Sequence, residues 1–158
     1  MIYNKQSLLT AAPIKDMLTE KVRGPLTSHG LSEAGYDIRI KQDLVISKVG
    51  VWIEGEYKPG TFALASSMEE FQMPEYLVGV VHDKSTWARQ KLSVFNTVIE
   101  PGWKGFLTLE LVYHGQAELV IPAGTGIAQV LFHEVMDYAS YDGKYQNQAD
   151  QPVEAIHG

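Results

Sequence analysis

Short apolar runs separated by turn residues constrain the fold of this chain more than any other feature of its sequence. The runs are rich in Val, Ile, Tyr, Phe and Trp, and Gly or Pro stands between most of them. They are too short for ordinary helices and are typical of strands. The expected strands are 36–40, 44–46, 51–53, 61–65, 77–82, 92–97, 106–113, 118–121 and 128–133. The pattern predicts a compact all-β barrel or sandwich.

The two ends of the chain differ from this strand-rich middle. Residues 5–18 carry Leu and Ile at roughly helical spacing, interrupted by Pro13, which predicts one or two short helical segments. A further helical turn is expected at 85–90. Residues 136–158 are polar and rich in Gly, Gln and Asp, a composition typical of a mobile tail. No segment has the composition of an interdomain linker, so residues 1–158 are expected to form one domain.

Composition excludes several functional classes. The net charge is -6 and no basic run is present, so neither nucleic acid nor an anionic membrane is an expected partner. The sequence shows no cationic leader and no apolar stretch long enough to cross a bilayer, which predicts a cytoplasmic protein. There are no cysteines, whereas zinc-dependent base deaminases hold their metal with Cys ligands. No zinc site is therefore expected.

The turn at residues 84–89 carries a concentration of polar chemistry. Lys84, Ser85, Thr86 and Arg89 bring two cations and two hydroxyls together, a grouping that suits phosphate oxygens. An ordinary helix start, with Ser85 as its N-cap and Arg89 in solvent, is the alternative.

Glu110 is the second candidate, because it lies inside the apolar run 106–113. A carboxylate in such a run is uncommon unless it is paired or functional. Its neighbours at positions 108 and 112 share one face of the expected strand, so a solvent-facing Glu110 is the alternative.

Three consecutive motifs in this region resemble the dCTP deaminase branch of the dUTPase-like superfamily. They are Lys84-Ser85-Thr86-Trp87-Ala88-Arg89, Pro101-Gly102-Trp103-Lys104-Gly105, and the apolar strand that reaches Glu110. Weaker similarity is found in 35–39, 126–129 and 144–148, so the resemblance runs from about Leu31 to Gln148. It implies a distorted β-barrel or jelly-roll of the dUTPase-like type, with residues 136–158 as a segment that covers the substrate.

The resemblance implies a hydrolase that deaminates dCTP to dUTP and ammonia without zinc and so feeds dUMP and thymidylate supply. Glu110 is then the proton-transfer residue, which takes a proton from water and returns protons to N3 and the leaving amine. Ser85 and Arg89 are expected to fix the water and to stabilise charge on the substrate. Mg²⁺ is expected only on the substrate phosphates. The implied assembly is a homotrimer with shared active sites.

The same resemblance predicts a set of nucleotide contacts. Glu100 stands where the family carries an Asp that meets the sugar 3'-hydroxyl, and Lys84 replaces the usual Arg. Tyr141 is one short shift from Tyr138 and could take its place. For the tail residues, exposure to solvent is the alternative. The predicted set is Lys84, Ser85, Thr86, Arg89, Val98, Glu100, Trp103, Thr108, Gln129, Tyr138, Lys144 and Gln148.

Other functions stay open at this point. A bifunctional deaminase and dUTPase shares the scaffold, and a pure dUTP diphosphatase is disfavoured because Glu100 stands where that branch needs an Asp. A catalytically silent nucleotide-binding regulator is a third possibility. The stretch 96–100 is shorter than in long bacterial deaminases, which leaves base specificity open.

The three tryptophans bear on assembly. Trp52, Trp87 and Trp103 lie beside turn residues, where they either bury against a partner subunit or cap the ends of the barrel.

Overall fold

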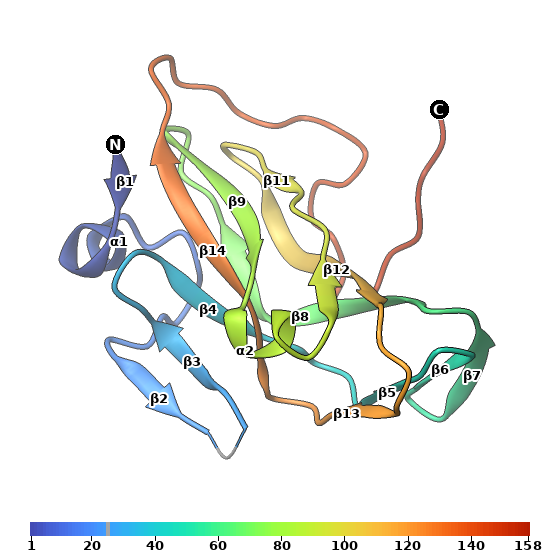
Figure 1. Cartoon of the computed structure of the whole chain (residues 1–158). Helices are drawn as coiled ribbons and strands as arrows, with labels where there is room; N and C mark the ends of the chain where they lie inside the picture. Colours follow the sequence, from blue (N-terminus) through green and yellow to red (C-terminus); the bar gives the residue numbers. More distant parts are fainter. Residues whose placement is uncertain (25) are drawn as a thin grey trace.

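The computed structural model describes residues 1–24 and 26–158, and strands dominate it (Figure 1). The largest sheet has seven strands in the order β11 (Val98–Ile99), β9 (Leu77–Asp83), β14 (Gly126–Glu134), β4 (Tyr36–Arg39), β3 (Ser28–Leu31) and β2 (Lys21–Arg23), with β1 (Ile2–Tyr3) pairing β14. The second sheet consists of β10 (Leu92–Val94), β12 (Lys104–Tyr113) and β8 (Phe62–Gln72). The third consists of β13 (Leu119–Ile121), β5 (Leu44–Ile46), β6 (Gly50–Ile53) and β7 (Glu56–Pro59).

The all-β prediction is confirmed, with differences in detail. Each of the nine expected strands is present, although β8 continues to Gln72 and β10 already ends at Val94. The expected turn at 85–90 forms the short helix α2 (Ser85–Ala88). Within the described residues the three sheets remain separate and do not close into one barrel. The strands that the sequence pattern missed are β1, β2, β3, β7 and β11.

Strand β8 extends beyond its apolar part because distant side chains satisfy its buried polar residues. The Gln42 side chain accepts a hydrogen bond from the Ser66 backbone N–H and donates one to the Ser66 hydroxyl, both at 2.8 Å. The buried Glu69 carboxylate accepts from the Arg39 backbone N–H at 2.9 Å and from its Nε at 2.8 Å. Buried polar groups are tolerated when they are paired in this way. The partners lie 24 and 30 residues away, outside any local pattern.

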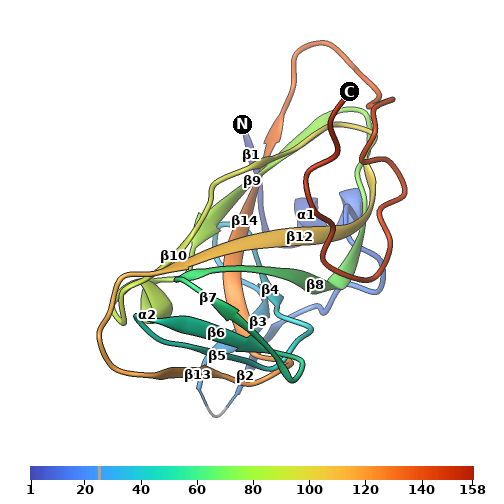
Figure 2. The same cartoon turned by 90° about the vertical axis from the view of Figure 1, so that its right-hand side faces the viewer.

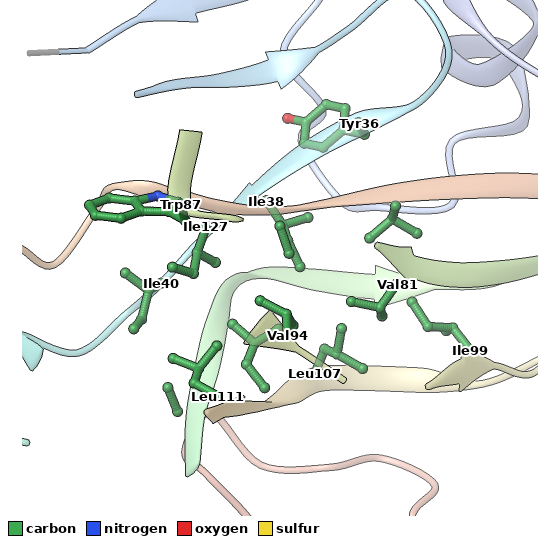
Figure 3. Packing of buried hydrophobic residues seen from close by; sticks show 14 of the residues in the cluster. Tyr36, Ile38, Ile40, Val81, Trp87, Val94, Ile99, Leu107, Leu111 and Ile127 are labelled. Carbon is green, nitrogen blue, oxygen red and sulfur yellow. The ribbon is translucent and has the colours of Figure 1, made fainter. Parts of the chain in front are cut away.

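The core lies between the sheets, where apolar side chains from several strands meet (Figure 3). Ile38, Val81, Leu107 and Ile127 point toward one another in this view and are buried. Trp87 of α2 packs on the same cluster, and its Nε1 donates to the Gly126 carbonyl at 2.7 Å. This indole holds α2 against the largest sheet.

The other two tryptophans differ in their exposure to solvent, which bears on whether a partner subunit buries them. Trp103 is buried within its own chain, as Trp87 is, so neither needs a partner subunit to leave solvent. Trp52 remains 52% exposed on β6 and packs on Tyr57 at a ring distance of 5.0 Å.

One helix forms in the N-terminal region, α1 (Lys5–Ala11). At its start the Ser7 hydroxyl accepts from the Asn4 backbone N–H at 3.0 Å and donates to the Asn4 carbonyl at 2.7 Å, and at its end Ala12 adopts the left-handed conformation before Pro13. No helix in the part of the chain that the structure describes is long and apolar enough to cross a membrane.

Candidate active site

A cavity of about 550 Å³ lies against β12, and six of the predicted site residues line it. These six are Val98, Glu100, Trp103, Thr108, Glu110 and Gln148. The rest of the wall is largely apolar and aromatic and consists of Phe62, Leu64, Thr97, Ile99, Leu107, Tyr141, Tyr145, Val153 and Ala155. A mostly apolar cavity with a few polar groups is typical of a small-molecule site.

Strand β12 aims Glu110 into this cavity through the alternation of its side chains. Leu109 and Leu111 are buried in the core on one face, so Thr108 and Glu110 lie on the other. The pairing with β8 shifts register between Phe106 and Thr108, and Glu110 stands opposite Leu64, which also lines the cavity. The alternative of an ordinary solvent-facing Glu110 therefore does not hold, because this side chain is half-buried in a pocket.

Burial sets the acidity of this carboxyl group. Desolvation raises the pKa of Glu110, and a hydrogen bond from its own backbone amide opposes the rise only in part. A carboxyl group with a raised pKa can hold and release a proton closer to neutral pH than an exposed glutamate can. The cavity thus contains a group suited to proton transfer.

The C-terminal segment forms one side of the cavity. Trp103 Nε1 donates to the Tyr145 carbonyl at 2.6 Å, and the Gln146 side chain accepts from the Lys104 backbone at 2.7 Å. Lys41 and Asp150 form an ion pair at 2.6 Å further along. Composition predicted a mobile tail, but in the structure these contacts hold the segment against the sheet.

Thr108 and Gln148 connect this segment to the floor of the site. The Thr108 hydroxyl accepts from Gln148 Nε2 at 2.8 Å and from the Val153 backbone N–H at 3.0 Å. Gly105 has a φ of +139°, and a Cβ there would lie 2.5 Å from the Gln148 nitrogen, so the close approach requires glycine. The Thr108 hydroxyl therefore already accepts two hydrogen bonds from the C-terminal segment of its own chain.

Five other predicted residues form a second group outside the cavity lining. Lys84 is the N-cap of α2 and Arg89 is its C-cap, and Ser85, Thr86 and Arg89 are exposed. Gln129 lies on β14, where it is paired in register with His82 of β9, close in sequence to this turn.

The residues that line the cavity do not include those of α2. The β10 end of β12 is close to α2, and the C-terminal segment passes its other end (Figure 2). One copy of the chain therefore does not bring Ser85 and Arg89 into the cavity that contains Glu110.

Two predicted contacts in the tail lie elsewhere. Tyr138 is 71% exposed and packs against Tyr76 at a ring distance of 5.8 Å. Lys144 places its ammonium 5.5 Å from the centre of the Tyr145 ring. Tyr141, the alternative that the sequence left open, does line the cavity.

No metal-binding cluster is found among residues 1–24 and 26–158, judged by groups of three or more His, Cys, Asp or Glu side chains. The anionic groups near the cavity are Glu100 and Glu110.

Comparison with known proteins decides the family. A family model described as dCTP deaminase-like matches residues 54–135, more than half of the chain. The chain belongs to the dCTP deaminase family.

Individual dCTP deaminases extend the match beyond that region. The enzyme of Roseiflexus castenholzii is 37% identical over 158 aligned residues, covering 85% of this chain and 86% of the relative. The dCTP deaminase of Chlamydia muridarum is 38% identical over 149, covering 78% of this chain and 77% of the relative. Among solved structures, native EIAV dUTPase aligns with a TM-score of 0.55 at 18% identity, covering 85% of this chain and 92% of that one. The dUTPase-like fold is thereby confirmed.

Sequence reasoning on this dCTP deaminase-like chain missed several residues of the cavity. Tyr145, Val153 and Ala155 line it, yet they belong to a polar segment whose composition predicts a tail in solvent. A usable signal was the spacing of aromatic residues at positions 141 and 145, because tyrosines in a polar tail often mark a docking point.

Proposed function

We propose that this chain deaminates dCTP, producing dUTP and ammonia. One observation carries the proposal: in a member of the dCTP deaminase family, Glu110 lies half-buried in a cavity with its pKa raised by burial. Hydrolytic deamination needs a group that accepts and then donates protons at the same site.

Glu110 performs the proton transfers in this proposal. Its carboxylate takes a proton from a water molecule as the water oxygen attacks C4 of the cytosine. The proton is delivered to N3, and the amino group leaves as ammonia after a further proton transfer while the C4 carbonyl forms. Removing water from around a carboxyl group brings its pKa toward the working pH, as this double role requires.

The sugar and base occupy the cavity. Glu100 and Trp103 lie in its wall, where Glu100 accepts from the sugar 3'-hydroxyl and Trp103 leaves no room for a 2'-hydroxyl. Val98 and Thr108 complete the wall, and Gln148 covers the nucleotide from the C-terminal segment. Mg²⁺ arrives as part of the substrate, bound to its phosphate oxygens. Because deoxynucleoside triphosphates are intracellular metabolites, we place the enzyme in the cytoplasm.

The active site is shared between copies of the chain in a homotrimer. Ser85, Thr86 and Arg89 carry phosphate chemistry but lie outside the cavity of their own chain, so the neighbouring copy supplies them. Apolar side chains at the cavity support this arrangement. Phe62 and Val98 line the cavity yet are 45% and 53% exposed, and Phe95 packs 6.1 Å from the Phe62 ring. Apolar surface of this kind is expected at an interface.

Product analysis tests the proposed reaction. The purified protein is incubated with dCTP and, separately, with dUTP, each with Mg²⁺, and nucleotides are separated by anion-exchange chromatography. Formation of dUTP and ammonia from dCTP is the expected result. Appearance of dUMP would add a dUTPase activity, and no turnover of dCTP would contradict the proposal.

A further inference from the structure

Lys84 does not present its ammonium group to solvent, although it begins a turn whose other polar side chains are exposed. Its Nζ lies 2.7 Å from Asp37 Oδ2 and 3.5 Å from Ser28 Oγ. Only 13% of the Lys84 side chain and 6% of the Asp37 side chain are exposed. Because a carboxylate at this distance already neutralises the ammonium, a phosphate group gains little from approaching it.

The ion pair crosses a strand of the largest sheet. Asp37 belongs to β4 and Lys84 follows β9, and β14 lies between these two strands. Gln129 of β14 is aligned in register with Asp37 on one side and with His82 on the other. The pair therefore ties the start of α2 to a strand that is not its hydrogen-bonded neighbour.

Two inward contacts thus fix this turn. Lys84 holds its beginning through Asp37, and the Trp87 indole holds its middle through the Gly126 carbonyl at 2.7 Å. Ser85 and Arg89 are left facing outward with no such restraint of their own in the described part of the chain. Their placement depends on the two inward residues.

We propose that Lys84 is a positioning residue that acts through Asp37, and that it does not bind the phosphates of the substrate. The Asp37–Lys84 pair sets the geometry from which Ser85 and Arg89 reach the nucleotide. This inference rests on the proposed function, and it revises the expectation from sequence that Lys84 meets phosphate directly.

A double-mutant cycle tests the inference with Asp37→Asn, Lys84→Met and the combined variant. Each single substitution leaves one buried charge unpaired, so kcat/KM for dCTP is expected to fall by about 10- to 100-fold. The combined variant removes both charges and is expected to recover part of that loss. Lys84→Arg keeps the pair and is expected to stay within about threefold of the parent. Thermal unfolding of each protein gives the folded fraction, to which kcat is normalised.

The opposite role for Lys84 predicts a different pattern. If its ammonium binds phosphate, Asp37→Asn frees it and lowers KM, and the combined variant has the same high KM as Lys84→Met. Either of these results would overturn the inference. Lys21→Met with Glu33→Gln is the matched control, because this 3.2 Å pair joins β2 of the same sheet to the bend after β3 and is more exposed. It is expected to leave kcat and KM unchanged.

Failure of the proposed reaction can be distinguished from failure of this inference. If the parent protein does not turn over dCTP, the proposed function fails, and the same set of variants is compared by the Kd for dCTP in calorimetry. Weaker binding in both single variants with recovery in the combined one still supports positioning. Tighter binding by Asp37→Asn contradicts it.

Discussion

Replacing Glu110 by glutamine separates its chemical role from its structural one. Glutamine has nearly the same shape and can still form hydrogen bonds, but it cannot carry the proton from water to the substrate. A positioned general acid or base contributes about 10²- to 10⁴-fold to rate, which corresponds to about 3–5 kcal/mol of activation free energy. We expect Glu110→Gln to lower kcat by this factor and to change KM by less than about threefold.

The same substitution has a predicted effect on stability, with a sign set by burial. Because burial raises the folded-state pKa of Glu110, folding favours the protonated carboxyl group. That stabilisation is fully present below the unfolded-state pKa and is lost as pH rises through the folded-state pKa. Glutamine stays neutral, so the variant is expected to be more stable than the parent at pH 8 and equally stable in acid.

Both effects are measured on the same preparations. Initial rates of dUTP formation at several dCTP concentrations give kcat and KM, and thermal unfolding from pH 4 to pH 8 gives the difference in Tm. Turnover within tenfold of the parent would refute the proton-transfer role of Glu110. A Tm that falls at pH 8 would refute the claim that burial penalises its ionised form.

Three further predictions concern the tail, the core and metals. Gly105→Ala is expected to raise KM and to make the C-terminal segment more sensitive to limited proteolysis, because its Cβ would collide with Gln148; unchanged proteolysis contradicts this. Arg39→Met leaves the Glu69 carboxylate buried without its charged partner and is expected to cost about 3 kcal/mol in urea unfolding, whereas a loss under 1 kcal/mol would argue against the pairing. Treatment with phenanthroline is expected to leave turnover intact, since no cysteine is available to hold zinc, and activity that is lost and then restored by zinc would show otherwise.

The local sequence pattern was sufficient to predict much of the fold. Strands such as β5, β9 and β12 combine apolar alternation with flanking turn residues, and they appear close to their expected bounds. The missed part of β8 is largely polar. Its buried residues Ser66 and Glu69 are paired with Gln42 and Arg39, which come close to them only when the chain folds. Pairing across 24 or 30 residues leaves no trace in local periodicity.

For the candidate site, the sequence motif led to a residue that lies in a cavity, whereas it did not predict how the other candidate residues are arranged. The motif around Glu110 placed that residue, and the structure gives it a cavity and a raised pKa. No sequence pattern revealed that Asp37 forms an ion pair with the ammonium group of Lys84. The docked C-terminal segment was hidden for a similar reason, because its anchors are backbone carbonyls and side-chain amides that any polar tail contains.

Complementation between two inactive variants tests the shared active site most directly. Glu110→Gln and Arg89→Ala chains are unfolded, mixed in equal amounts and refolded together, and dUTP formation from dCTP is compared with each variant refolded alone. If one copy supplies Glu110 and its neighbour supplies Arg89, random assembly leaves about one quarter of the sites intact. We predict recovery of about that fraction of parental activity. Absence of recovery in mixed assemblies, verified by differently tagged chains, would mean that both residues serve the site from one chain and would contradict the account.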